Sequence, residues 1–385
     1  MNEMKRVAFV KLYPDITGEQ FSIDASLMKW VKDSSNCENP SFITFQNNTV
    51  EYNPLWRQHK FYYLNTDSED EFSNKMKEIN RAFDLLIVIV NENIVDPYIY
   101  HGLFSFLKQA NVPMITIMKY LPFDEELTEM VQYVINKSSH IFSVSNFITN
   151  SLFKNFYLDE AKLETIKDWS EAIAKDGQIE MKKLFGLEEN KVLLSVGPMK
   201  PTTYFDGLIL KLEKLLHHNN YKLVIIGEPY NNEISDIYHS YLEALIKEHK
   251  LEHKIWLIDM RLEEKDLLSF INMSDIYISP IMDMNNIYDP LLTTALSNNC
   301  LTIASPYPYA KEVLDNNRGL IYDFNHTDDK NLLLAIESSM KEESIKRGFN
   351  YNKRNIEDSR QLKMKFNKIL CNLNVEPYKN QYQEA

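Results

Sequence analysis

The chain has 385 residues, which is enough for two domains of ordinary size. Hydrophobic residues make up 44% of it and charged residues 25%, a composition typical of soluble globular proteins rather than of disordered ones. The net charge of −13 comes from acidic residues spread along the chain. This charge argues against nucleic acid as the main partner and against docking on an anionic membrane.

The three cysteines, Cys37, Cys300 and Cys371, are far apart and show no metal-ligand spacing. Their number is odd and they are widely spaced, so the sequence predicts a reducing compartment. The nine histidines also give no pair with metal-ligand spacing, so we expect no metal and no cofactor. The longest apolar run, Leu85–Val90, is far short of a membrane span, and the N-terminus MNEMKRVAFVKLYPD has no long apolar segment. We therefore expect no transmembrane segment, no signal peptide and a cytoplasmic location.

The first half of the chain alternates short buried strands with helices. The predicted strands are Val7–Leu12, Ser41–Phe45, Lys60–Leu64, Leu85–Val90, Met114–Met118 and His140–Val144. Helices are predicted over Phe21–Val31, Glu125–Asn136 and Ser145–Phe156, the last with Ser145 or Asn146 at its N-cap. The less regular stretch Leu163–Gly177 is predicted to cross between domains.

The second half repeats strand and helix about six times. The predicted strands are Val192–Val196, Leu223–Ile226, Ile255–Ile258, Ile276–Ser279, Leu301–Ala304 and Gly319–Tyr322. They are nearly uncharged, as strands of a parallel sheet are when helices cover both faces. Between them, Tyr238, Leu242 and Leu245 recur at helical spacing. The pattern predicts an α/β fold with a doubly wound parallel sheet and ligands at the carboxyl ends of the strands.

Three stretches of the second half carry a family resemblance: KKLFGLEENKVLLSVG (Lys182–Gly197), YLEALIKEHKLEHKIWLIDMRLEEKDLLSFINMSDIYISP (Tyr241–Pro280) and TALSNNCLTIASPYPYAKEVLDNNRGLIYDFNHTD (Thr294–Asp328). They resemble the donor-sugar domain of family-four glycosyltransferases of the GT-B fold. About 140 residues are covered well, and the N-terminal half only loosely. Asp84 before its strand and HIFSVSNFITNSLF, which begins at His140, are similar to elements of the family's acceptor domain.

The resemblance implies a GT-B fold, in which two Rossmann-like doubly wound parallel-sheet domains face a cleft and the C-terminal helix crosses back. On this basis residues 1–177 are expected to form an acceptor-side domain and residues 178–345 a donor-side domain. Residues 346–385 are expected to form the crossing helix, Ser359–Leu373, and a loosely attached polar tail, Asn374–Ala385.

The first donor-site signature of the family is an Arg just after "VG" and a Lys a few residues on, which together grip the donor diphosphate. Two cations there offset the charge that develops on the leaving group. Here the Arg position is Pro198, and an ungapped match puts Thr203 at the Lys position. Lys200 takes over as a phosphate ligand if the loop shifts by three residues, and is otherwise an ordinary loop lysine.

The second signature is a pair of glutamates, one for the donor sugar and one for the ribose hydroxyls. In this chain the matching positions are Asn286 and Thr294, so both charges are gone, although each side chain still forms single hydrogen bonds. Tyr288 and Asp289 lie between them. Asp283 or Asp289 could replace a missing glutamate only if its loop is displaced, because neither has the spacing of the family's glutamates. Each lost charged partner typically costs about 1.5–3 kcal/mol at a buried site.

Two more family features are reduced in the first half of the chain. The loop after the first strand keeps a single glycine, Gly18, which either approaches the donor phosphates or only forms a turn. The His that commonly contacts the donor sugar is absent, because Met118, Lys119 and Tyr120 stand at its place. We expect Lys119 to be a solvated surface lysine rather than a residue that faces the cleft.

These observations favour a retaining, hexosyl-type glycosyltransferase with an altered donor pocket. It would transfer a sugar from a nucleotide-sugar co-substrate to a glycan or glycoprotein acceptor in glycan biosynthesis. The donor would be bound by Gly18, Lys200, Asn286, Tyr288, Asp289 and Thr294. The catalytic residues are not identified.

Two alternatives stay open. The loss of all the family's charged donor residues favours a pseudoenzyme that binds an acceptor, or serves as a subunit of a partner glycosyltransferase or of a homo-oligomer. A different enzyme on the same two-domain plan, such as a nucleotide-sugar epimerase, would need carboxylates or a histidine converging in the cleft. The sequence contains no such recognisable set.

Overall fold

A computed structural model gives the structure of the chain, and it describes residues 5–11, 28, 30–32, 37–45, 59–64, 68–91, 97–121, 125–166, 178–218, 220–228, 232–260, 262, 264–283, 286–298, 300–314, 319–322, 330–341, 363–364 and 366–369. The chain packs into two compact units. One takes in Asp24–Lys167 with Met1–Ile16 and Gln361–Ala385, and the other takes in Asp168–Arg360.

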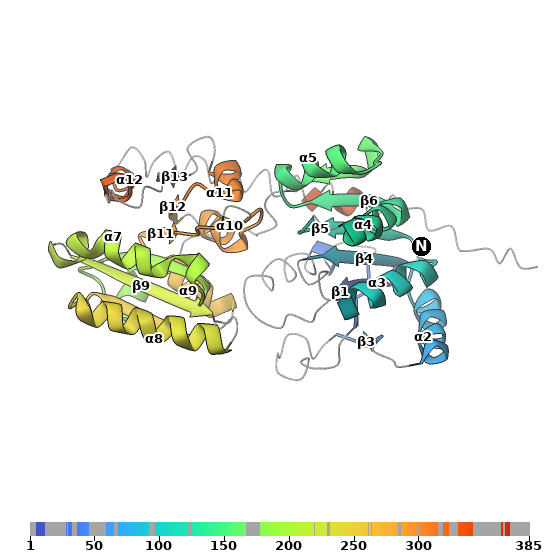
Figure 1. Ribbon diagram of the computed structural model, residues 1–385, viewed down its shortest axis with the longest axis horizontal. Coiled ribbons are helices and arrows are strands. Elements are labelled where there is room, and N and C mark those ends of the chain that lie inside the picture. Colours follow the sequence, from blue (N-terminus) through green and yellow to red (C-terminus); the bar gives the residue numbers. More distant parts are fainter. Residues whose placement is uncertain are drawn as a thin grey trace, which may run out of the picture. The chain divides into compact units, whose positions relative to one another are not determined.

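The first unit is built on a seven-stranded parallel sheet with the strand order β3-β2-β1-β4-β5-β6-β7. Its strands are β1 (Val7–Lys11), β2 (Ser41–Thr44), β3 (Phe61–Tyr63), β4 (Leu85–Val90), β5 (Met114–Met118), β6 (Ser138–Ser143) and β7 (Leu163–Thr165). Its helices are α2 (Glu69–Ala82), α3 (Pro97–Gln109), α4 (Glu125–Lys137) and α5 (Asn146–Asn155), with a 3-10 turn at Glu160–Lys162 (Figure 1). Strand β4 is buried along its full length, as its six apolar residues predict.

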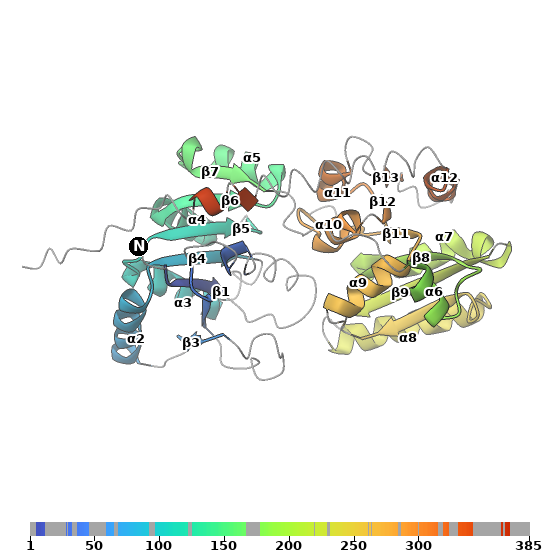
Figure 2. The ribbon, with the colours of Figure 1, turned by 180° about the vertical axis from the view of Figure 1, so that it is seen from behind.

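The end of the chain returns to this first unit. Residues 363–364 and 366–369 are helical, and the ring of Phe366 packs between Trp30 and Phe142, with ring centroids 6.0 and 5.4 Å away. Figure 2 shows this short red segment beside β6. The expectation that the last helix crosses back is therefore confirmed for these residues, while the polar tail Asn374–Ala385 lies outside the described residues.

The second unit is built on a six-stranded parallel sheet with the order β10-β9-β8-β11-β12-β13. Its strands are β8 (Lys191–Pro198), β9 (Tyr221–Glu228), β10 (Ile255–Asp259), β11 (Ile276–Ser279), β12 (Leu301–Ala304) and β13 (Leu320–Ile321). Its helices are α6 (Gln178–Leu184), α7 (Phe205–His218), α8 (Asn232–Glu248), α9 (Glu264–Met273), α10 (Pro290–Ser297), α11 (Pro308–Val313) and α12 (Lys330–Ser339), with a 3-10 turn, η5, at Pro201–Thr203.

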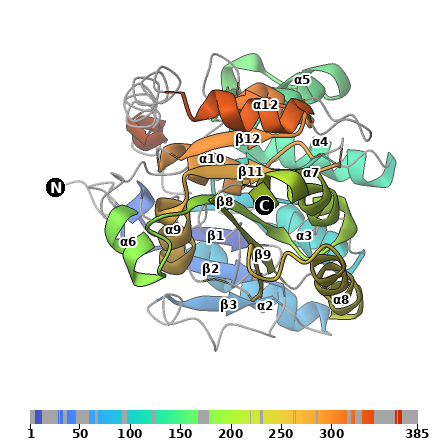
Figure 3. The ribbon, with the colours of Figure 1, turned by 90° about the vertical axis from the view of Figure 1, so that its left-hand side faces the viewer.

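Helices cover both faces of this second sheet, so the fold is doubly wound. Two separate cores result: one joins the sheet to α7, α8 and α12, and the other joins it to α6, α9, α10 and α11. Figure 3 shows α7 and α8 on one side of the strands and α6 and α9 on the other. Alternate residues of β8 serve the two cores, with Leu193 in the first and Leu194 in the second.

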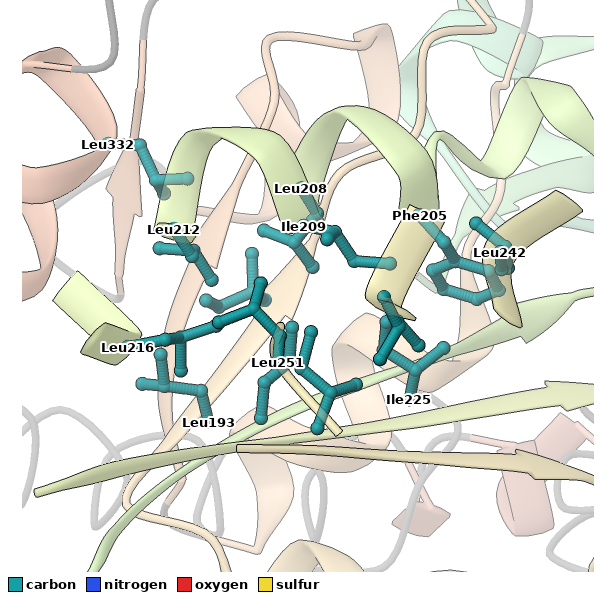
Figure 4. Close-up of a cluster of buried hydrophobic side chains, with 14 of the residues drawn as sticks. Leu193, Phe205, Leu208, Ile209, Leu212, Leu216, Ile225, Leu242, Leu251 and Leu332 are labelled. Carbon is teal, nitrogen blue, oxygen red and sulfur yellow. The ribbon is translucent and has the colours of Figure 1, made fainter. Parts of the chain in front are cut away.

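The first of these cores explains why α7 forms where it does. Its buried residues Leu208, Ile209, Leu212 and Leu216 recur at helical spacing, and Figure 4 shows them directed at the strands that carry Leu193 and Ile225. Each fully buried leucine or isoleucine contributes roughly 1.5–3 kcal/mol relative to an exposed one. The predicted helix face of α8 is confirmed in the same core, where Tyr238, Leu242 and Leu245 are buried.

All twelve predicted strands are present, and their ends either match or shift by one or two residues. The short strand β7 is the one that the sequence analysis missed, because its three residues are only half-buried and carry the charge of Glu164. Of the predicted helix Phe21–Val31, most lies outside the described residues. In the described part of the chain, no helix combines the length and the apolar character that a membrane crossing requires.

Candidate functional site

The strand order of the second sheet creates a topological switch point between β8 and β11. From β8 the chain moves outward through β9 to β10, whereas from β11 it moves the other way through β12 to β13. The loops that follow β8 and β11 therefore separate above two neighbouring parallel strands, and such a switch point is where ligands bind in open α/β sheets. Lys200 follows β8, and Asn286, Tyr288 and Asp289 follow β11.

The loop after β8 is held in a fixed conformation around Lys200. The Met199 N–H donates to the carbonyl of Glu228 (2.7 Å), the Thr203 N–H to that of Lys200 (3.0 Å), and the Thr203 hydroxyl to that of Pro198 (2.6 Å). A Cβ on Gly197 would come 2.9 Å from the methyl group of Thr203, so the loop closes tightly over that glycine. These contacts fix the backbone around Lys200, which is the one cationic residue of this loop.

The loop after β11 is tied to the first loop and to α11. The Met282 N–H donates to the carbonyl of Thr202 (3.0 Å), and this bond joins the two loops. Asn286 accepts from the Tyr288 N–H through its side chain (3.2 Å), and its carbonyl accepts from the Tyr309 N–H (3.3 Å). The rings of Tyr288 and Tyr309 then meet edge to face, with centroids 5.5 Å apart.

Asp289 is the N-cap of α10 and is buried, with 3% of its surface exposed. One carboxylate oxygen accepts from the Leu292 N–H (3.0 Å), and the other accepts from the hydroxyls of Ser279 (3.1 Å) and Tyr307. Burial raises the pKa of Asp289, and these hydrogen bonds act in the opposite direction. The carboxylate thus joins the carboxyl end of β11, the start of α10 and the residues that follow β12.

Thr294 lies inside α10, all of whose residues are buried. Its hydroxyl donates to the carbonyl of Pro290 (2.8 Å), and its own carbonyl accepts from the Asn298 amide (2.8 Å). The hydroxyl group that stands at the second glutamate position of the resembled family is therefore used within the helix.

Of the six predicted donor-site residues, Lys200, Asn286, Tyr288 and Asp289 lie in the two loops at this edge of the second unit, and a fifth, Thr294, lies inside the buried helix α10 that follows. The sixth, Gly18, lies outside the described residues. The capping role of Asp289 had a signal in the sequence, because an Asp followed by Pro is a strong helix start. Ser279 and Tyr307, which share its carboxylate, carried no such signal.

The expectation for Lys119 was wrong. It lies at the carboxyl end of β5 and is buried, with 5% of its surface exposed, rather than solvated. Its N–H donates to the carbonyl of Val90 (2.8 Å) and continues the ladder between β4 and β5 by one residue. A lysine directly after five buried strand residues follows them into the interior, and residue type alone does not reveal that.

The charges at the switch point are few. Among the described residues of the two loops (199–204, 280–283 and 286–289), the charged side chains are those of Lys200, Asp283 and Asp289. No group of three His, Cys, Asp or Glu side chains in the described ranges has the geometry of a metal site. Charge stabilisation of an anionic ligand at this edge would come from Lys200 and from backbone N–H groups.

Comparison with known families gives a match for the second half of the chain. Residues 177–356 match the family described as "Glycosyl transferases group 1". That range holds all strands of the second sheet and both loops of the switch point. No protein of curated function matches the sequence.

Solved structures of three proteins cover nearly the whole chain. HepE from Anabaena, solved with UDP and glucose, is 10% identical with a TM-score of 0.72, over 96% of this chain and 100% of that one. A glycosyltransferase from Rickettsia africae is 17% identical with a TM-score of 0.70, over 97% and 100% of the two chains. Sucrose-phosphate synthase from Thermosynechococcus elongatus is 11% identical with a TM-score of 0.64, over 95% and 99%. These likenesses confirm the predicted GT-B fold.

Proposed function

We propose, on the premise that residues 177–356 match the glycosyl transferases group 1 and that the chain has the GT-B fold, that the protein transfers a hexosyl group from a nucleotide sugar to a glycan or glycoprotein acceptor. One observation carries the proposal most directly. Lys200 stands in a tightly held loop at the switch point of the very sheet that the family match covers. HepE, whose structure was solved with UDP and glucose, shares this fold.

The proposed roles follow from the chemistry of each group. Lys200 and nearby backbone N–H groups would hold the donor diphosphate, and the ammonium would offset the charge that the diphosphate gains as the bond to the sugar breaks. Asn286, Tyr288 and Thr294 would face the sugar and the ribose, with Asp289 fixing the start of α10. Gly18 would approach the donor phosphates through its backbone. Transfer would retain the anomeric configuration, with no cofactor besides the donor.

A second candidate is a non-catalytic relative that binds a nucleotide sugar, an acceptor or a partner without transferring sugar. The contacts of Asp289 and Thr294 favour it, because both side chains form their hydrogen bonds with other groups of the protein rather than offering them to a donor sugar. Such a protein would act beside an active glycosyltransferase or as a homo-oligomer. The thiols of Cys37 and Cys300 are buried, and the reducing, cytoplasmic setting stays a prediction.

Replacing Lys200 with alanine is expected to weaken the binding of a nucleoside diphosphate by roughly 10-fold to 100-fold. A hydrogen bond to a charged group contributes about 1.5–3 kcal/mol, and each 1.4 kcal/mol is a factor of ten. Isothermal titration with UDP, GDP and ADP would measure this change. Lys214→Ala removes an exposed lysine of α7 from the same unit and should leave the affinity unchanged.

Incubation of the wild-type protein with the sugar conjugate of the bound nucleotide then separates the two candidates. Release of nucleoside diphosphate with a candidate acceptor glycan, lost in Lys200→Ala, would support transfer. Nucleotide binding without any sugar release across an acceptor panel would support the non-catalytic relative. Absence of all nucleotide binding by folded protein would overturn the donor site itself.

A further inference from the structure

Two residues other than glycine have a positive φ in the described part of the chain, Lys250 (55°) and Tyr204 (62°). A left-handed conformation costs an ordinary L-residue roughly 1–2 kcal/mol. At Lys250 the cost has a structural cause, because the residue ends α8: its N–H donates to Lys247 (3.1 Å), and the next N–H, of Leu251, donates back to Ile246 (2.9 Å). This is the usual left-handed helix ending, with an exposed side chain.

Tyr204 is different, because a large aromatic residue occupies the strained position. It ends the 3-10 turn η5, and its N–H donates to the carbonyl of Pro201 (2.9 Å). A glycine would make the same turn without strain. Strained backbone of this kind is found where it presents a side chain for function. The turn therefore explains the backbone conformation, but not the tyrosine.

The ring of Tyr204 lies between the loop after β8 and the first turn of α7. It lies against the backbone of Gly207 in the first turn of α7, where an added Cβ would come within 1.9 Å of the ring. The side chain is only partly buried, unlike the core residues around it. Burial and the charge of Asp206 raise the pKa of the Tyr204 hydroxyl, which keeps the ring neutral in the physiological range.

The position of the ring relative to Lys200 suggests its ligand. Three residues separate them, and the loop between them is the one that Thr202 joins to the loop after β11. A nucleotide sugar carries its negative charge on the diphosphate and a flat, neutral base at its far end. A fixed cation and a fixed aromatic ring on one loop match these two parts.

Building on the nucleotide-sugar site proposed above, we propose that Tyr204 is the stacking platform for the base of the donor nucleotide. Gly207 keeps the space that lets the ring lie flat on α7, and the left-handed backbone aims it there. Stacking tolerates every base, since each has a π face, and is worth roughly 1–3 kcal/mol per base in other nucleotide-binding proteins. It would compensate in part for the missing charged residues around the diphosphate and the ribose.

The test uses two ligands that differ in the base. Affinities of the full-length protein are measured by isothermal titration for inorganic pyrophosphate and for whichever of UDP, GDP and ADP it binds. Tyr204→Asn removes the ring but keeps a residue that tolerates positive φ. We expect this variant to bind the nucleotide roughly 10-fold to 100-fold more weakly, with unchanged affinity for pyrophosphate. Tyr204→Phe and Tyr204→Trp keep an aromatic face and should restore nucleotide binding.

Lys250→Gly is the matched control, since it changes the other left-handed residue in the same unit and should alter neither affinity. Equal nucleotide affinity of Tyr204→Asn and wild type would overturn the stacking role while leaving the donor site intact. An equal loss for nucleotide and pyrophosphate would also overturn it, because it would mean that the loop was distorted. If wild-type protein binds no nucleotide, the proposed function and this role both fall.

Discussion

Replacing Asp275 with alanine is expected to lower the free energy of unfolding of the second unit by about 3 kcal/mol. Its carboxylate lies just before β11 and accepts from the Lys182 ammonium (2.5 Å) and from the Val192 N–H (2.7 Å). Only 15% of the Asp275 side chain and 11% of the Lys182 side chain are exposed. The variant would leave an ammonium and an N–H with one acceptor fewer in a part of the molecule that water reaches poorly.

Urea unfolding of the wild-type protein and three variants, followed by circular dichroism, would measure this effect and its cause. Lys182→Met combined with Asp275→Ala removes both charges, so it should be more stable than Asp275→Ala alone. Lys75→Ala breaks the exposed pair with Glu71 (3.0 Å) in α2 and should cost less than about 1 kcal/mol. A cost for Asp275→Ala no larger than that of Lys75→Ala would contradict the prediction.

The same residue shows which parts of the fold can be predicted from the sequence. Asp275 precedes β11, whose four residues are all buried, so the strand was predicted and is confirmed. Strands covered on both faces give a strong signal because every residue is apolar. β7 gave none, since it is three residues long and half-buried at the edge of its sheet.

The position of the candidate site at the carboxyl ends of the strands was predicted from the sequence, but the hydrogen bonds between its residues were not. The residues that follow β8 and β11 converge because of the strand order, which the alternation of strands and helices already suggested. The sequence did not reveal that the hydroxyls of Ser279 and Tyr307 share the carboxylate of Asp289, since 28 residues separate the two hydroxyl groups. It also did not reveal the left-handed backbone of Tyr204, because that position normally selects glycine.

Replacing Asp289 with alanine is expected to cost about 3 kcal/mol of stability and to weaken nucleotide binding at the switch point. About 1 kcal/mol is the lost helix cap, and the rest comes from the buried hydroxyls of Ser279 and Tyr307, which lose their acceptor. Ser145→Ala removes another buried cap, that of α5 in the first unit, and should cost only about 1 kcal/mol. Thermal unfolding and titration with the bound nucleotide would measure both effects. Equal costs for the two variants would contradict the shared role of Asp289.

Asp289→Asn removes the ionisable carboxyl group but keeps the helix cap, because the amide oxygen still accepts from the Leu292 N–H. Burial raises the pKa of Asp289 in the folded protein above its unfolded value of about 4, so the folded protein holds this proton more tightly. The corresponding stability is fully present below pH ~4 and is lost as the pH rises through the raised pKa.

The asparagine variant lacks this dependence. Its stability relative to wild type should therefore increase as the pH rises from about 4 and should level off above the folded pKa of Asp289. Urea unfolding of both proteins between about pH 4 and pH 8 would measure the difference. A difference that does not change with pH would mean that Asp289 ionises as easily in the folded protein as in the unfolded chain. Its burial would then not favour the protonated form.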